Sequence, residues 1–450
     1  MDNVVTTAVS AANAPAPSRR PPSGMATFSL IWAGQLISLT GSAMTWFALT
    51  VWVWEQTGQA TPLTLVSFFS YLPGVLFSPL AGALVDRWNR KLVMLLSDSG
   101  SALATVVVCG LYLTHNLQVW HIYVLGGCGS LFLAFQFPAY SAAVTLMVSK
   151  SHYSRAQAML GLAQVAAAIV APAMAAALWP HLGLAGISGL DIASYLVAVA
   201  TVVGARIPQP PLSAAGRAAR GSLWSEAGYG FRYIYAHPSL CALTLVVFVS
   251  NLIENLGTPL IAPLILARSA NDAGILGSVQ SFGAVGGLIG GIVVTLWGGP
   301  RNKVQGVLLS AMGAAILGTA LTGIGRSRWI WTLASFDYAF FIAMVDSFYQ
   351  AFWQVKVAPD IQGRVFAARS LLAQLPIPLS MLACGPLADR VFEPALHTAG
   401  GFTWLVGSGP GAGMALMLIL AGSLQALVCL GGGLMPVVRY AEELLPDQVN

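Results

Sequence analysis

Apolar residues follow one another along this chain in about twelve long stretches, separated by short polar segments. Each stretch is close to the ~20 residues that a helix needs to cross a bilayer, and the apolar and polar residues do not alternate as they do in the strands of a membrane barrel. The pattern therefore predicts an all-α, polytopic membrane protein. The predicted spans are residues 27–53, 62–85, 92–114, 119–146, 156–179, 184–205, 239–266, 273–298, 304–325, 329–355, 365–388 and 411–436.

The longest polar interruption covers residues 206–238 and leaves six predicted spans on either side. Within it, apolar residues recur at helical spacing, which predicts a short amphipathic helix on the membrane surface. These residues are Leu223, Trp224, Ala227, Phe231 and Ile234. The predicted divisions are a disordered cytoplasmic tail (1–24), an N-terminal six-helix half (25–205), a cytoplasmic linker (206–238), a C-terminal six-helix half (239–436) and a second cytoplasmic tail (437–450).

Composition and charge agree with a membrane protein. Hydrophobic residues make up 56% of the 450 residues and charged residues only 8%, too few to cover a water-soluble protein of this size. If the N-terminus is inside, 17 of the 21 Lys and Arg residues fall in cytoplasmic segments. This asymmetry predicts two cytoplasmic termini in a plasma (inner) membrane, and it explains the net charge of +5 without a nucleic-acid partner. The five cysteines lie inside predicted spans without a CxxC pair, so we expect neither a disulfide framework nor a metal site.

The segment after the second span reads Gly82-Ala-Leu-Val-Asp86-Arg87-Trp-Asn-Arg90-Lys91. It resembles the signature loop between the second and third helices of the major facilitator superfamily, with an asparagine at one glycine position. A carboxylate at the C-terminus of a helix is unfavourable unless a positive group compensates it. The resemblance implies a latch that joins the two halves in the outward-facing state. Its expected members are Gly82, Asp86, Arg87, Arg90, Lys91 and Arg364.

The fifth predicted span contains Ala167-Ala-Ile-Val-Ala171-Pro172-Ala-Met-Ala175-Ala176, in which Pro172 is expected to kink the helix. This stretch resembles the antiporter signature of the same superfamily, with alanine at every glycine position. The stretches Phe135-Gln136-Phe137-Pro138-Ala139 and Gly363-Arg364-Val365-Phe366 are similar to the macrolide-efflux and enterobactin-exporter branch. The resemblance implies the major facilitator fold, export of a small molecule in exchange for protons, and a monomer.

Acidic residues at bilayer depth are costly, by about 2.5–3.5 kcal/mol or more each, and so are candidates for function. Glu254 lies near the middle of the seventh span, where it shares a polar stripe with Asn251. Asp346 lies near the middle of the tenth span and Asp337 nearer its outer end. A buried carboxyl group takes up and releases a proton as its surroundings change, so we expect Glu254, and secondly Asp346 and Asp337, to couple transport to protons.

Uncharged polar and aromatic residues on the first, fourth, seventh and tenth spans are the expected substrate contacts, because the resemblance implies that these four spans line a central cavity. They are Gln35, Gln136, Tyr140, Asn251, Tyr349 and Trp353. Two further acids receive structural interpretations. Asp98 is expected to form a salt bridge with Arg87, Arg90 or Lys91, and Asp191 is interpreted as a boundary residue near the outer end of a span.

No Lys or Arg is predicted at the midplane, which favours a cationic or neutral amphipathic substrate over an anionic one. The sequence contains no Gly-Lys-Ser/Thr nucleotide loop, so an ion gradient rather than a bound cofactor or ATP must supply the free energy. Taken with the resemblance, which implies export with alternating access, these observations favour a proton-coupled exporter of macrolide- or drug-like compounds. A siderophore exporter of the same fold is the alternative, and an integral-membrane enzyme or a non-transporting receptor is disfavoured.

Overall fold

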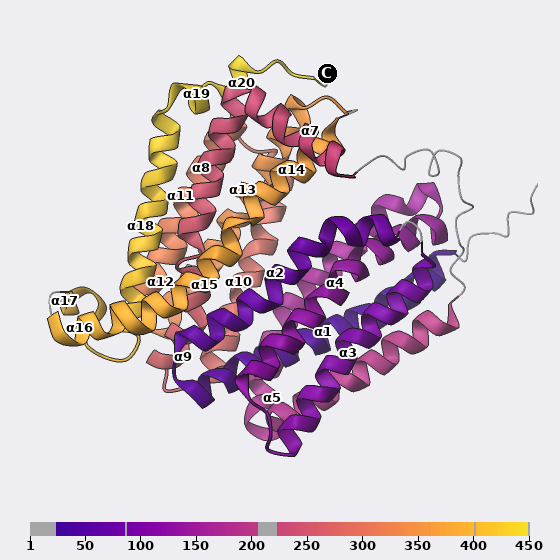
Figure 1. The fold of residues 1–450 in the computed structure, drawn as a ribbon, viewed down its shortest axis with the longest axis vertical. Helices are drawn as coiled ribbons and strands as arrows, with labels where there is room; N and C mark the ends of the chain where they lie inside the picture. The colour runs from indigo at the N-terminus through magenta and orange to yellow at the C-terminus, as the bar shows by residue number, and fades with distance from the viewer. Residues whose placement is uncertain (1–23, 86–87, 206–222, 360, 400–401, 449–450) are drawn as a thin grey trace, which may run out of the picture.

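The structure of the protein is a computed structural model that describes residues 24–85, 88–205, 223–359, 361–399 and 402–448. It consists of helices arranged as two bundles, an N-terminal half and a C-terminal half (Figure 1). The predicted all-α fold is therefore confirmed. The cytoplasmic position of the termini stays a prediction.

The N-terminal half contains long helices that correspond to the first six predicted spans. They are α1 (Gly24–Thr57), α2 (Ala60–Val85), α3 (Arg90–Leu113), α4 (Val119–Met147) and α5 (Tyr153–Gly204), with a 3-10 turn η1 (Lys150–His152) before α5. The helix α5 has two arms, because the backbone at Gly183 adopts a φ of +56°, a conformation that only glycine reaches without strain. The break coincides with the gap predicted between the fifth and sixth spans.

The C-terminal half contains more interrupted helices. It begins with α7 (Leu223–Ala236), α8 (Pro238–Glu254), the turn η2 (Thr258–Leu260), α9 (Ile261–Arg268), α10 (Ala273–Trp297), α11 (Lys303–Gly313), the π-helix η3 (Ala314–Ala320) and α12 (Leu321–Ile324). It continues with α13 (Arg328–Lys356), α14 (Gln362–Gln374), α15 (Pro376–Leu387), the π-helix η4 (Ala388–Phe392), α16 (Glu393–Ala399), α17 (Thr403–Val406), α18 (Ala412–Leu434), α19 (Pro436–Arg439) and α20 (Ala441–Leu444).

Within the described residues, ten helical stretches are long and apolar enough to cross a membrane. One of them is the 52-residue α5, whose two arms are each of membrane-crossing length. The 29-residue α13 is also long enough, although it carries Asp337 and Asp346. When the two arms of α5 are counted separately and α13 is added, the described chain has the predicted twelve segments of membrane-crossing length. The predicted linker helix forms as α7, where Ile234 is buried, and its place on the membrane surface stays a prediction.

Small residues set the closest helix contacts. A Cβ atom at Gly34 of α1 would lie 2.5 Å from Thr201 Oγ1, and one at Gly41 would lie 2.3 Å from Ser194 Oγ, both on the second arm of α5. In the C-terminal half, Gly286 and Gly290 of α10 meet the backbone of α13 in the same way. The glycine-rich eighth span therefore serves close helix packing rather than ligand binding.

The two halves touch at one end and diverge toward the end that carries α7 and α20 (Figure 1). At the contact end, Trp54 Nε1 donates to Asn271 Oδ1 at 2.8 Å. The carboxylate of Asp389, in the C-terminal half, accepts hydrogen bonds from the backbone nitrogens of Ala60 and Thr61 at 3.0 and 2.7 Å. Asp389 thus caps the first turn of α2 in the opposite half, where a helix N-terminus favours a negative charge.

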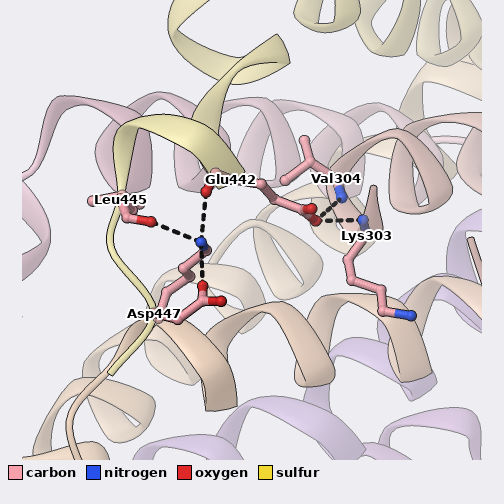
Figure 2. Close-up of polar contacts among 6 residues, drawn as sticks. Lys303, Val304, Glu442, Leu445 and Asp447 are labelled. Atoms are coloured by element: carbon pink, nitrogen blue, oxygen red, sulfur yellow. Dashed lines mark hydrogen bonds and ion pairs between the residues drawn. The ribbon is translucent and has the colours of Figure 1, made fainter. Parts of the chain in front are cut away.

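The C-terminal segment folds back over the diverging end of its own half (Figure 2). The buried Lys356 Nζ donates to the carbonyls of Glu442 and Leu445 at 2.6 and 2.7 Å and pairs with Asp447 at 2.6 Å. The carboxylate of Glu442 accepts from the backbone nitrogens of Lys303 and Val304, at the N-terminus of α11.

This arrangement predicts unequal roles for two acids of the segment. Glu442→Ala removes the acceptor of the first two backbone nitrogens of α11, while the N-cap Asn302 stays in place, and is expected to lower the free energy of unfolding by about 1–2 kcal/mol. Asp447→Ala removes a partner whose side chain is 61% exposed, and the expected loss is under about 1 kcal/mol. Thermal unfolding of both variants in one detergent measures the difference, and an equal or larger loss for Asp447→Ala would contradict it.

Candidate substrate cavity and acidic sites

A cavity of about 590 Å³ lies within the N-terminal half, between helices α1 to α5, with Met381 of α15 at its margin. Its size is in the range that holds drug-sized ligands, roughly 300–1,000 Å³. Among the described residues that line it, none is Lys, Arg or His. Five aromatic side chains line it: Trp32, Trp46, Tyr71, Tyr140 and Tyr195.

Asp98 of α3 lies on the cavity wall, held by two amide side chains. Gln35 of α1 donates from Nε2 to Asp98 Oδ2 at 2.9 Å, and Gln136 of α4 donates to Oδ1. Tyr140, one turn beyond Gln136, lines the same cavity, and its buried hydroxyl has no hydrogen-bond partner among the described residues. The structure therefore brings three predicted substrate contacts, Gln35, Gln136 and Tyr140, together around a carboxylate.

In the part of the chain that the structure describes, Asp98 is held by these uncharged donors, whereas Arg87, one of the expected partners, lies outside the described residues. Lys91, one of the expected partners, donates instead to the carbonyls of Val203 and Ala205, both at 2.8 Å. It therefore compensates the C-terminal end of α5, where unpaired carbonyls favour a positive charge. The structural interpretation of Asp98 is corrected: its side chain is a buried carboxylate on a ligand-sized cavity.

Asp191, on the second arm of α5, lines the same cavity. Ser42 of α1 donates to its Oδ1 at 3.0 Å, and Thr105 of α3 donates to its Oδ2 at 2.9 Å. The side chain is only 4% exposed. The interpretation as a boundary residue was wrong, because the distance of a residue from the end of a span does not reveal which way its side chain faces.

Glu254 is the last residue of α8 and is buried within the C-terminal half. Tyr338 of α13 donates to its Oε1, and Gln425 of α18 donates to its Oε2 at 2.9 Å. The helix ends here, so the predicted polar stripe does not continue along one straight helix. Asn251 lies one turn earlier, and its amide donates to the carbonyl of Ala373 in α14 at 2.9 Å. Proton coupling through Glu254 stays a prediction.

The acids of α13 have different surroundings. The side chain of Asp346 is exposed, and that of Asp337 is half-buried. Asp346 lies within electrostatic reach of the guanidinium of Arg369 in α14. The guanidinium of Arg369 lies among aromatic rings inside the half. The sequence predicted acids without a basic residue beside them. This describes the lining of the N-terminal cavity, but Asp346 has the basic residue Arg369 nearby.

Tyr349 and Trp353, two predicted substrate contacts, belong to this cluster. The guanidinium of Arg369 lies 4.9 Å from the ring centre of Tyr349, 5.7 Å from that of Trp353 and 5.1 Å from that of Phe366. Such distances correspond to cation–π contacts. Trp353 is fully buried in the apolar core of the half, so it is separated from the N-terminal cavity. Its contact with a substrate stays a prediction.

The members of the predicted latch are only partly described. Gly82 lies in α2, whereas Asp86 and Arg87 fall outside the described residues. Arg90 begins α3, whose N-terminus is capped by the side chain of Asn89. Arg364, in α14, stacks on Tyr229 of α7 at 5.8 Å.

The contacts described for Lys91 and the stacking of Arg364 on Tyr229 each lie within one half. The latch across the halves therefore stays a prediction.

Pro172 lies in the first arm of α5, and the helix continues through it. A Cβ atom at Gly277 of α10 would lie 2.7 Å from the Pro172 carbonyl oxygen and 2.5 Å from the Cβ of Ala176. The alanine-substituted signature is thus a point of close approach between the halves, as its small residues suggest. The kink at Pro172 stays a prediction, and the non-helical backbone inside α5 lies at Gly183.

Comparisons with known proteins bear on this arrangement. The profile of the Major Facilitator Superfamily matches residues 31–381. The chain is 29% identical to macrolide efflux protein A of Streptococcus pyogenes, over 81% of this chain and 90% of the relative. It is 22% identical to the multidrug efflux pump Tap of Mycolicibacterium fortuitum, over 83% and 90%. A solved bacterial homologue of the human lysosomal transporter Spinster is similar with a TM-score of 0.67 at 15% identity, over 93% and 98%.

Two helical halves with a ligand-sized cavity define a polytopic membrane transporter. The chain belongs to the major facilitator superfamily, because the family profile covers more than half of its length. It is therefore a multi-pass membrane protein that moves a small molecule, and it is a secondary transporter rather than an enzyme.

Proposed function

We propose that the protein exports small amphipathic compounds, macrolide- or drug-like, across the plasma membrane in exchange for protons, and that it acts as a monomer with both termini in the cytoplasm. The observation that carries this proposal is the aromatic cavity of the N-terminal half, which holds two carboxylates and has no base among its described lining residues. Efflux proteins among the relatives support the direction of transport.

The charge of the cavity selects between the two candidate substrate classes. Siderophores are often anionic, and an anion beside Asp98 and Asp191 would meet two like charges without a cation to offset its desolvation. A cationic or neutral compound meets uncharged donors, aromatic faces and carboxylates. The cavity therefore favours a drug-like exporter over the siderophore exporter.

In this proposal the substrate binds in the N-terminal half, and the protons bind in the C-terminal half. Glu254 is buried between α8, α13 and α18, so uptake or loss of a proton there changes the contacts of three helices at once. Asp346 and Asp337 of α13 are the second candidates. Alternating access then requires the halves to separate at the end where they now touch and to meet at the end where they now diverge.

Glu254→Gln tests the coupling. The amide keeps hydrogen bonds to Tyr338 or Gln425 but cannot take up a proton, so transport in vesicles is expected to lose its dependence on an imposed pH gradient. The measurement is export of a fluorescent dye or a macrolide at several pH gradients, with Asp272→Asn, at the exposed cap of α10, as control. Wild-type rates with unchanged pH dependence in Glu254→Gln would contradict the coupling role.

A further inference from the structure

The two carboxylates of the cavity are held at two levels along the same pair of helices. On α1, Gln35 donates to Asp98, and Ser42, seven residues later, donates to Asp191. On α3, Asp98 itself is followed seven residues later by Thr105, which also donates to Asp191. Seven residues bring a helix back to nearly the same face, two turns and about 10 Å further along its axis. The second carboxylate therefore lies about 10 Å beyond the first.

Near each carboxylate there is a hydroxyl group without a hydrogen-bond partner among the described residues. The hydroxyl of Tyr140, within electrostatic reach of Asp98, has no hydrogen-bond partner among the described residues. The hydroxyl of Thr45, a residue only 5% exposed, lies beside Asp191 without a hydrogen bond of ordinary geometry. Both residues line the cavity. Each carboxylate thus has a neighbouring buried hydroxyl that belongs to a residue of the cavity wall.

Neither carboxylate has a positive partner in the described cavity wall. The side chains that hold them are two amides and two hydroxyls, which stabilise a negative charge without neutralising it. A buried carboxylate gains most from a cation that is desolvated beside it, and aromatic faces such as those of Trp32 and Trp46 add to the attraction. The wall can therefore accommodate two positive charges at a fixed spacing.

We propose that the cavity recognises dibasic amphipathic compounds, with one basic nitrogen at Asp98 and a second at Asp191. This inference rests on the proposed export of amphipathic compounds and narrows their class. The close packing of Gly34 and Gly41 of α1 against the second arm of α5 holds Asp191 at its level, so the spacing of the two charges is a property of the fold. Compounds with one charge occupy one level only.

The test is equilibrium binding to the full-length protein in detergent. The probes are octamethonium, which carries two quaternary nitrogens on an eight-carbon chain, its single-charge counterpart octyltrimethylammonium, and the shorter dication tetramethonium. Octamethonium is expected to bind at least about tenfold more tightly than either of the others, because only it reaches both carboxylates. Equal affinities for the three probes in the wild type would overturn the inference.

The variant Asp191→Asn tests whether Asp191 binds the second positive charge or only supports the fold. We expect it to reduce the advantage of octamethonium over octyltrimethylammonium to less than about twofold, while octyltrimethylammonium, which can still bind beside Asp98, loses no more than about twofold in affinity. An equal loss for both probes would indicate a structural role and overturn the proposal. If this variant does not fold, Asp191→Glu, which keeps the charge, and the chain-length series on the wild type decide the question.

The outcomes also distinguish this inference from the proposed function. Transport of single-charge dyes without any preference for octamethonium would defeat the dibasic inference and leave the exporter intact. Failure of every cationic probe to bind, together with no export of any neutral or cationic amphipathic compound, would defeat both.

Discussion

Asp98→Asn is expected to reduce the affinity for cationic amphipathic compounds at least about 100-fold, because a cation about 4 Å from a carboxylate gains about 4 kcal/mol at an effective dielectric constant near 20. The asparagine keeps the shape of the side chain and a hydrogen bond to Gln35 or Gln136, so the cavity is expected to persist. Binding of ethidium to purified protein, and its efflux from cells that lack other pumps, measure the loss.

The control for Asp98→Asn must also remove one negative charge from the protein, but at a position outside the cavity. Asp447→Asn, at an exposed ion pair of the C-terminal segment, meets this requirement and is expected to bind ethidium like the wild type. A neutral amphipathic compound of similar size should bind Asp98→Asn and wild type alike. An equal loss of neutral and cationic compounds would show that Asp98 only supports the fold.

Gly385→Val is expected to lower transport at least about tenfold by preventing the two halves from meeting at their contact end. A Cβ atom at Gly385 of α15 would lie 2.1 Å from Thr64 Oγ1 and 2.6 Å from Thr61 Cα, on α2 of the other half. The second of these neighbours is backbone and cannot rotate away. The same turn of α2 is capped by Asp389, so the overlap would also pull that carboxylate from its hydrogen bonds.

The expected signature of Gly385→Val is a loss of transport rate with ethidium binding preserved, since the cavity lies within one half. Gly363→Ala is the matched control, because a Cβ atom there meets nothing within 4 Å. Measurement of the efflux rate and of the Kd for ethidium in both variants separates the two effects. Near wild-type efflux in Gly385→Val would mean that transport does not require this contact.

Most of the fold follows from the sequence because a bilayer restricts the chain to apolar helices of one length. The spans, the division into halves and even the break at Gly183 between the fifth and sixth spans were predictable on that basis. The interruptions of the C-terminal half were not. The end of α8 at Glu254 lies inside a predicted span, where Gly257 and Pro259 follow within five residues. A criterion of apolar length alone joins α8 and α9 into one span, although the glycine and the proline mark the place where the helix is interrupted.

The sequence pointed to three residues that line the cavity but not to the carboxylates beside them, and their contact with a substrate stays a prediction. Gln35, Gln136 and Tyr140 were identified as polar residues on apolar helices, and the structure brings them together. Asp98 was not predicted as a cavity residue because the basic residues near it in the sequence suggested a salt bridge. Lys91, one of these residues, donates instead to the carbonyls at the end of α5. A usable signal did exist: Asp98 and Thr105 share a face of α3, as Gln35 and Ser42 share a face of α1.

The most direct test of the account is uphill accumulation of ethidium by purified protein in proteoliposomes with an imposed pH gradient as the sole driving force. The wild type is expected to accumulate the dye until the gradient collapses. The triple variant Glu254→Gln, Asp337→Asn, Asp346→Asn is expected to bind the dye and fail to accumulate it. Accumulation against a gradient by that triple variant would contradict proton exchange through the acids of the C-terminal half.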